Sequence, residues 1–152
     1  MPDQVGFGSR KIQELLDLAD LQKIQGGDAN GQPLLDKATR TLASALALQT
    51  ADADSSYALA YDAACFACTA LLAQQGLRPT TKGGHYAVEQ AMRAQFQTHF
   101  RTFGALRRRR NELEYPTAHN LGVEPTEAVE AHDIAAQIVE AATKLLPHLR
   151  FF

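Results

Sequence analysis

The amino-acid sequence predicts an all-α protein, an up-and-down helical bundle of about five to six helices that fills residues 1–152 as a single domain. Two observations support this fold class. Apolar residues recur three and four positions apart along most of the chain, and the strict apolar–polar alternation of exposed strands is absent. The chain is also long enough to enclose a sizeable core. Antiparallel helices with short connections would produce such a bundle.

The amino-acid composition excludes some classes of protein for this chain. Apolar residues make up 45% of the chain, which excludes a disordered tail. The formal net charge of -2 gives no overall attraction to nucleic acid or anionic lipid, so any such binding needs a local patch. No basic start precedes an apolar run, and no apolar stretch approaches the ~20 residues of a membrane helix. We therefore expect a cytoplasmic protein without membrane association.

Three helices are expected in the first half of the chain. Their bounds are Ser9 to about Ile24, a helix with Pro33 in its first turn, and Asp52 or Asp54 to Gln75. Glycines follow the first and third of these segments and favour helix ends there. The third segment is rich in alanine and apolar on nearly every face, which is typical of a central helix.

Three more helices are expected in the second half, after a loop over 78–84. Their bounds are about His85 to Phe100, Phe103 to Glu114, and Pro125 to just before Pro147. Thr102 is a candidate cap for the short fifth helix. Pro116 ends that helix, because the residue before a proline is pushed out of the helical region. We expect the fifth helix to pack across one end or side of the others.

Four consecutive arginines, Arg107 to Arg110, lie in the fifth helix. Successive residues spread around a helix, so these four side chains cannot all face one partner. Arg107 shares a face with Arg110 and, one turn further, with Glu114. The run is either a solvated basic face with an Arg110–Glu114 pair, or an anion site, since arginine holds phosphate in a bidentate fork.

The residues that follow favour a small polar site. Asn111 is a poor helix former within a helix, and Tyr115 comes four residues later, just ahead of Pro116. A cation, an amide and a phenol therefore converge near the end of a short helix, beside a loop.

This segment, Arg-Asn-Glu-Leu-Glu-Tyr-Pro from Arg110 to Pro116, resembles the signature of the HEPN superfamily of small helical bundles. Tyr61-Asp62-Ala63-Ala64 in the alanine-rich helix and the Gly83-Gly84-His85 connection are also similar to that family. The resemblance implies a HEPN-like homodimer with a cleft where the two motifs meet. It also implies either RNA cleavage without metal, by the motif arginine and a histidine, or a nucleotide-binding or inactive partner of a nucleotidyltransferase in a toxin–antitoxin pair.

The sequence departs from the family pattern at the histidine. In that family four to six residues separate the arginine from the histidine, and at the three positions this allows the chain has Tyr115, Pro116 and Thr117. Histidine suits proton transfer near neutrality, whereas a phenol is a poor base at pH 7 but stacks well on nucleobases. The resemblance therefore favours binding of RNA or a nucleotide and leaves open whether the chain is a metal-independent endoribonuclease.

Candidate site residues follow from the motif. Arg110, Asn111 and Tyr115 are the candidates for the catalytic positions. Arg107, Arg110, His85 and His119 are the candidates for binding phosphate or nucleotide. His85 opens a helix beside two glycines and His119 lies in the following loop, so each is either a cleft residue or a cap or loop residue.

Other polar and reactive residues have plainer interpretations. Cys65 and Cys68 lie mid-helix among apolar residues and are read as core side chains. Two cysteines are too few for a tetrahedral zinc site, and no histidine pair has helical metal-binding spacing, so no metal and no cofactor is predicted. Asp62 is a candidate partner for an arginine.

Two alternatives stay open beside RNA or nucleotide binding. In the first, the chain is a non-catalytic protein-interaction module, whose arginines pair with acidic residues of another chain such as a nucleotidyltransferase. In the second, Arg110, Glu114 and Tyr115 only tie the helix end to the bundle. The apolar ending, Phe151-Phe152, is expected to pack on the domain or across a dimer axis.

Overall fold

The computed structural model describes residues 2–118 and 122–152, with side chains outside 2–7 and 97–99. Within these ranges the chain forms six α-helices and two short 3-10 helices. The α-helices are α1 (Pro2–Asp17), α2 (Gln32–Leu48), α3 (Ala53–Gln74), α4 (Gly84–Phe100), α5 (Phe103–Glu114) and α6 (Pro125–Leu145), and the 3-10 helices are Gly26–Asp28 and Leu146–His148. The predicted all-α bundle of about six helices is confirmed.

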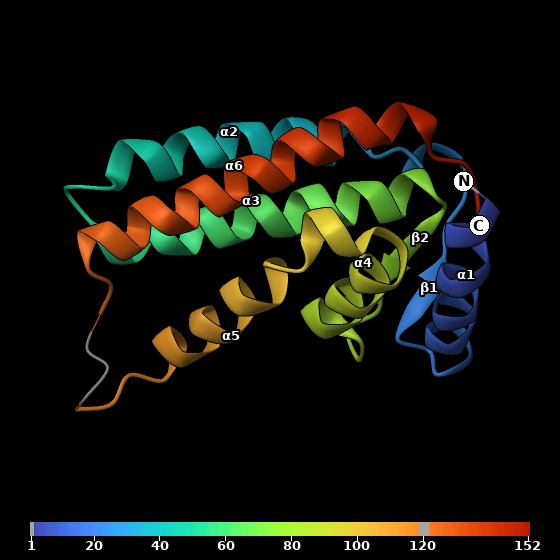
Figure 1. The fold of residues 1–152 in the computed structure, drawn as a ribbon, viewed down its shortest axis with the longest axis horizontal. Coiled ribbons are helices and arrows are strands. Elements are labelled where there is room, and N and C mark those ends of the chain that lie inside the picture. Colours follow the sequence, from blue (N-terminus) through green and yellow to red (C-terminus); the bar gives the residue numbers. More distant parts are fainter. Residues whose placement is uncertain (1, 119–121) are drawn as a thin grey trace.

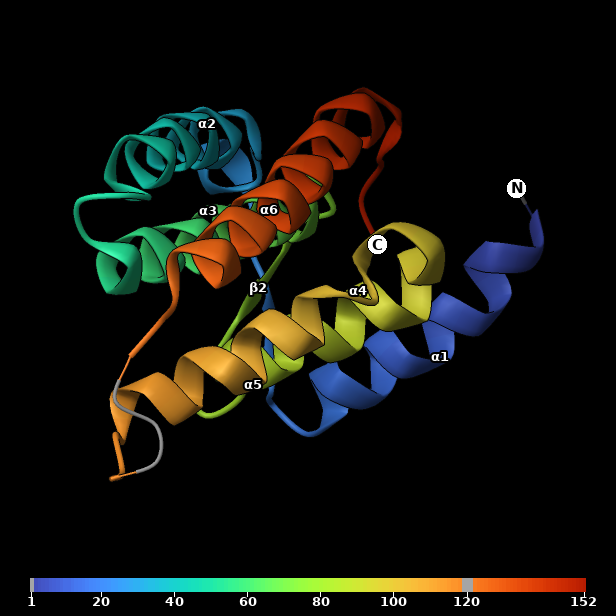
Figure 2. The same ribbon diagram turned by 60° about the vertical axis from the view of Figure 1, so that its left-hand side comes forward.

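The helices form two groups around α3 (Figure 1). On one side, α2 and α6 lie along α3, and on the other side α1, α4 and α5 lie beneath it, with α1 against α4 (Figure 2). The core between them is built from fully buried side chains such as Leu71, Leu72, Met92, Phe100 and Ile138. The short helix α5 runs along one side of the molecule, as expected.

The central helix α3 begins and ends as the sequence predicts. The Asp52 carboxylate accepts the backbone N–H of Ser55 at 3.1 Å and caps the helix, and Gly76 follows its last turn. By length and composition alone, α3 could cross a membrane, so the expectation that no stretch is apolar enough was wrong. In the structure, 72% of its most apolar window is buried inside the domain. Packing against α2 and α6 accounts for this apolar surface.

The first helix differs from its prediction at both ends. It begins at Pro2, so Ser9 lies inside α1, and it ends at Asp17 instead of near Ile24. Ala19 adopts a left-handed φ of 59°, which no α-helix accommodates. The chain reverses there, and Leu21 enters the core from an extended segment.

A two-stranded antiparallel sheet is the element that the sequence analysis missed. Strand β1 (Leu21–Lys23) pairs with β2 (Leu77–Pro79), with Leu21 opposite Pro79 and Lys23 opposite Leu77. The expected loop over 78–84 therefore begins as a strand. Each strand has three residues, too few for a period of two to show in the sequence. The buried Leu21 and Leu77 side chains anchor this sheet to the core.

The remaining helices start close to their predicted positions, with two local differences. Thr102 precedes α5 but makes no side-chain capping hydrogen bond, because its own backbone is already helical, with φ -75° and ψ -16°. Tyr86, near the start of α4, has its large ring exposed rather than packed in the core. Its ring lies instead against the guanidinium of Arg107, with 5.6 Å between the guanidinium carbon and the ring centroid.

Candidate functional site

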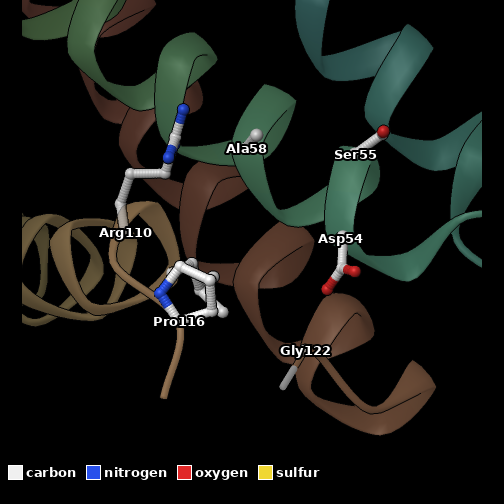
Figure 3. A pocket seen from close by; sticks show the side chains of 7 residues that line it. Asp54, Ser55, Ala58, Arg110, Pro116 and Gly122 are labelled. Carbon is white, nitrogen blue, oxygen red and sulfur yellow. The ribbon is translucent and has the colours of Figure 1, made fainter. Parts of the chain in front are cut away.

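A hollow of about 350 Å³ lies between the first turns of α3 and the last turns of α5. Its lining residues are Asp54, Ser55, Ala58, Arg110, Leu113, Pro116 and Gly122. Figure 3 shows Arg110 rising from α5 on one side of the hollow and Asp54 projecting from α3 on the other. The structure therefore brings three residues of the Arg110–Pro116 segment, Arg110, Leu113 and Pro116, to one small concave site.

The Arg110 guanidinium is held by its own helix. Its Nη1 atom is 3.2 Å from Glu114 Oε1, the pair across one helical turn that the solvated-face alternative predicts. The guanidinium is only partly exposed, so it is oriented before any ligand arrives. Such a pair at a protein surface contributes only about 0.3–0.5 kcal/mol, so a phosphate that offers two oxygens is able to replace the carboxylate.

The far side of the hollow is acidic and well ordered. Asp54 Oδ1 accepts the backbone N–H of Val123 at 2.6 Å, which ties the segment before α6 to the start of α3. The Ser55 hydroxyl donates to Asp52 at 2.5 Å and so completes the helix cap. A ligand in the hollow would meet a cation at one end and a hydrogen-bond acceptor at the other.

Asn111 and Tyr115 do not line the hollow. Asn111 is exposed on the outer side of α5. Tyr115 ends the helix with φ -124° and ψ 70°, and its backbone N–H donates to Glu112 at 3.3 Å. The Tyr115 side chain is 77% exposed, the largest exposed fraction of any large apolar side chain in the described residues. The motif thus presents an accessible ring on the residue before Pro116, which itself lines the hollow.

Arg107 does not point into the hollow. Its Nε donates to Oε2 of Glu89 at 2.6 Å, and Glu89 is one of the few buried polar residues in the described part of the chain. The sequence analysis missed Glu89 because its partner lies on another helix. One signal was present: Gly104 is a costly residue within a helix, and a Cβ there would lie 2.1 Å from Glu89 Oε1. A glycine within a helix, such as Gly104, can indicate that a neighbouring helix or side chain packs closely against the backbone there.

Arg109 and Arg108 have separate partners. Arg109 grips Glu127 of α6 with two nitrogens, at 2.5 and 3.2 Å, and also donates to the carbonyl of Gly122 at 3.3 Å. Arg108 Nη1 lies 3.6 Å from Glu89 Oε1. Each of the four arginines therefore lies within 4 Å of a carboxylate, so α5 is tied to both α4 and α6.

His85 is exposed at the start of α4, and its Nδ1 is hydrogen-bonded to the buried hydroxyl of Tyr61. Burial raises the pKa of Tyr61 well above its ordinary value, so the phenol stays neutral. The next residue on α3, Asp62, is half-buried. Burial raises the pKa of its carboxyl, while the positive charges of Arg110 and His85 oppose the rise. His85 and Arg110 thus both lower the pKa of the Asp62 carboxyl, but neither His85 nor Asp62 lines the hollow. His119 lies outside the described residues.

The cysteines are core residues, as predicted. Cys65 and Cys68 are buried free thiols, and burial raises the pKa of Cys65 to about 11. Among the described residues, no group of three or more histidine, cysteine, aspartate or glutamate side chains is arranged to hold a metal ion.

No protein-family model, curated protein or solved structure matches this chain. The functional conclusion therefore rests on the residues and geometry of α5 and the helices around it.

Proposed function

We propose that the chain is a HEPN-like protein that binds RNA or a nucleotide, of the toxin–antitoxin kind, with weak or absent metal-independent ribonuclease activity. Arg110 binds phosphate in the hollow, Tyr115 stacks on a base at the rim, and Asn111 supplies hydrogen bonds beside them. The observation that carries the proposal is the pairing of a pre-oriented guanidinium in a concave site with an exposed aromatic ring five residues further on.

The size and polarity of the hollow support a nucleotide-sized ligand. Its volume of about 350 Å³ falls at the lower end of the range for small-molecule sites. The phosphate belongs at the Arg110 end, because Asp54 would repel it from the opposite side. A carboxylate at that opposite end accepts hydrogen bonds from ribose hydroxyls or from exocyclic amines.

Tyr115 favours binding over cleavage. A tyrosine stands where the resembling family has its histidine, and an exposed phenol is suited to stacking rather than to taking a proton at pH 7. The role of His85 in the site is positional in this proposal, because its Nδ1 is already bonded to Tyr61.

A titration of the purified chain with fluorescein-labelled RNA and with uridine 5′-triphosphate tests the proposal. Arg110→Ala should weaken binding of both ligands about tenfold or more, since it removes charged hydrogen bonds to phosphate. Tyr115→Ala should weaken binding, whereas Tyr115→Phe, which keeps the ring, should not. Glu114→Gln should strengthen binding because it releases the guanidinium.

Arg40→Ala is the matched control, since Arg40 is an exposed arginine on α2, outside the hollow. Thermal unfolding establishes that each variant is folded. Unchanged affinity in a folded Arg110→Ala variant would contradict the proposal.

A second candidate function is a non-catalytic protein-interaction module that pairs with another chain such as a nucleotidyltransferase. The observation that favours it is an apolar groove of about 770 Å³ beside the C-terminus, where Phe151 is largely exposed. The two functions separate by experiment: a folded chain that binds neither RNA nor nucleotide, yet co-elutes with a co-expressed nucleotidyltransferase-type chain in size-exclusion chromatography, would favour the second.

A further inference from the structure

A buried carboxylate lies where α4 crosses α5. The Glu89 side chain is only 3% exposed, and Gly104 of α5 leaves the space that its carboxylate fills. Its Oε2 atom accepts the Nε–H of Arg107 at 2.6 Å. A buried charge is tolerated when it is paired in this way, so one arginine suffices to hold Glu89 in the interior.

Two further arginines surround the same carboxylate without forming a close contact. Arg93 Nη1 is 3.8 Å and Arg108 Nη1 is 3.6 Å from Glu89 Oε1, both longer than a hydrogen bond. Their side chains are 58% and 61% exposed. Arg107 already pairs with Glu89, so Arg93 and Arg108 leave an excess of two positive charges at the surface. This local charge is opposite in sign to the net charge of -2 of the whole chain.

An exposed aromatic ring lies within this charged surface. Tyr86 is on α4, two helical turns before Arg93, and therefore on the same side of the helix. Its exposed ring lies against the Arg107 guanidinium, which supports it from α5. Arginines beside an accessible ring are the pattern that single-stranded nucleic acids require, phosphates meeting cations and a base stacking on the ring.

The basic residues lie close to the proposed site along the chain. Arg107 precedes Arg110 by three residues, about one turn of α5. A strand with one phosphate at Arg110 would pass Asn111 and Arg107 to reach Arg93 and Arg108. A mononucleotide in the hollow would not span this path.

We propose that Tyr86, Arg93, Arg107 and Arg108 form a basic face that binds the backbone of single-stranded RNA, so that the ligand of this protein is a strand and not a free nucleotide. This inference rests on the proposed function at Arg110 and extends it to a specific class of ligand. Arg93 and Arg108 contact phosphates, Tyr86 stacks on a base, and the Glu89–Arg107 pair holds the two helices and the ring in place.

The experiment compares the wild type with the double variant Arg93→Gln/Arg108→Gln, using a labelled 12-nucleotide oligouridine RNA and uridine 5′-triphosphate as probes. The double variant should bind the RNA about tenfold more weakly, and the slope of log affinity against log salt should fall by about 1.4, at about 0.7 for each lost phosphate contact. Its affinity for the triphosphate should not change. Tyr86→Ala should weaken RNA binding, and Tyr86→Phe should not.

Arg40→Gln/Arg150→Gln is the matched control, because it removes two exposed arginines that lie outside α4 and α5. Equal RNA affinity in the wild type and the Arg93/Arg108 variant would overturn the inference, and so would an equal loss in the control. Arg110→Ala separates the two proposals. If it leaves triphosphate and RNA binding intact while the Arg93/Arg108 variant loses RNA, the function proposed at Arg110 fails and the basic face stands. If the wild type binds neither probe, both fail.

Discussion

Burial and nearby positive charges have opposite effects on the pKa of a single residue, Asp62. Its half-buried carboxylate is close enough to Arg110 and His85 for both charges to act on its pKa, yet burial outweighs them and the pKa is raised. A carboxylate kept in an unfavourable environment beside an arginine is a feature that functional sites often share. Such a residue lowers stability at neutral pH, which makes its contribution measurable.

Asp62→Asn should raise the melting temperature at pH 7. Because the folded-state pKa of Asp62 lies above the ordinary value of 3.8, the charged carboxylate destabilises the folded state whenever the pH is above both values. As the pH falls through the raised pKa, the folded carboxyl takes up its proton first and the penalty disappears. Thermal unfolding from pH 7 to pH 3 should therefore show an advantage of the variant that shrinks at low pH. A variant less stable than the wild type at pH 7 would show that the attraction to Arg110 outweighs burial.

Residue-scale prediction from sequence succeeded for local pairs and failed for distant ones. The Arg110–Glu114 pair was predicted because four-residue spacing places both side chains on one helical face. Glu89 was missed because its partners Arg107 and Arg108 reach it from a different helix. Only Gly104 indicates the contact between Glu89 and α5 in the sequence, because glycine is unfavourable within a helix.

At the scale of elements, the entry into α4 shows why the connection before it contains glycine. A Cβ on Gly83 would lie 2.1 Å from the backbone carbonyl oxygen of Asp20. The same carbonyl accepts the N–H of Thr80 at 3.0 Å, so the segment before α4 is fixed against the end of α1. Backbone atoms cannot move aside as the end of a long side chain does.

Gly83→Ala should therefore destabilise the fold by roughly 1–3 kcal/mol, the usual range for overpacking. Gly27→Ala is the matched control, since no atom lies within 4 Å of the Cβ position there. Urea unfolding of the two variants measures the difference in the free energy of unfolding. Equal stabilities would show that the contact between Asp20 and the start of α4 relaxes freely.

The bounds of the elements were predictable where a local signal marks them. Pro33 in the first turn of α2 and Asp52 at the cap of α3 are such signals, and both were interpreted correctly. The end of α1 and the β1–β2 sheet depend on Leu21 and Leu77, which are distant in the sequence and meet only in the folded core. Pairing over such separations leaves no periodic pattern in either segment.

At the scale of the whole molecule, the helical bundle explains why α3 is buried and why the second part of α5 lies at the surface. α3 is enclosed by its neighbours, so its apolar composition is used for packing. α5 contributes Phe103 and Leu106 to the core from its first turn, the four arginines and Asn111 follow, and the exposed Tyr115 is the residue at its C-cap. This helix, with Arg110 in the hollow, is held to α4 by Glu89 and to α6 by Glu127.

The most direct test of the central claim is an NMR titration of the isotope-labelled chain with a short oligouridine RNA, followed in backbone amide spectra. The account predicts perturbed resonances at Ser55, Arg110, Leu113 and Tyr115 around the hollow. The proposed basic face adds perturbations at Tyr86, Arg93 and Arg108, and resonances on the outer side of α2 stay in place. Perturbations confined to the C-terminal groove near Phe151, or the absence of any perturbation at a saturating RNA concentration, would contradict it.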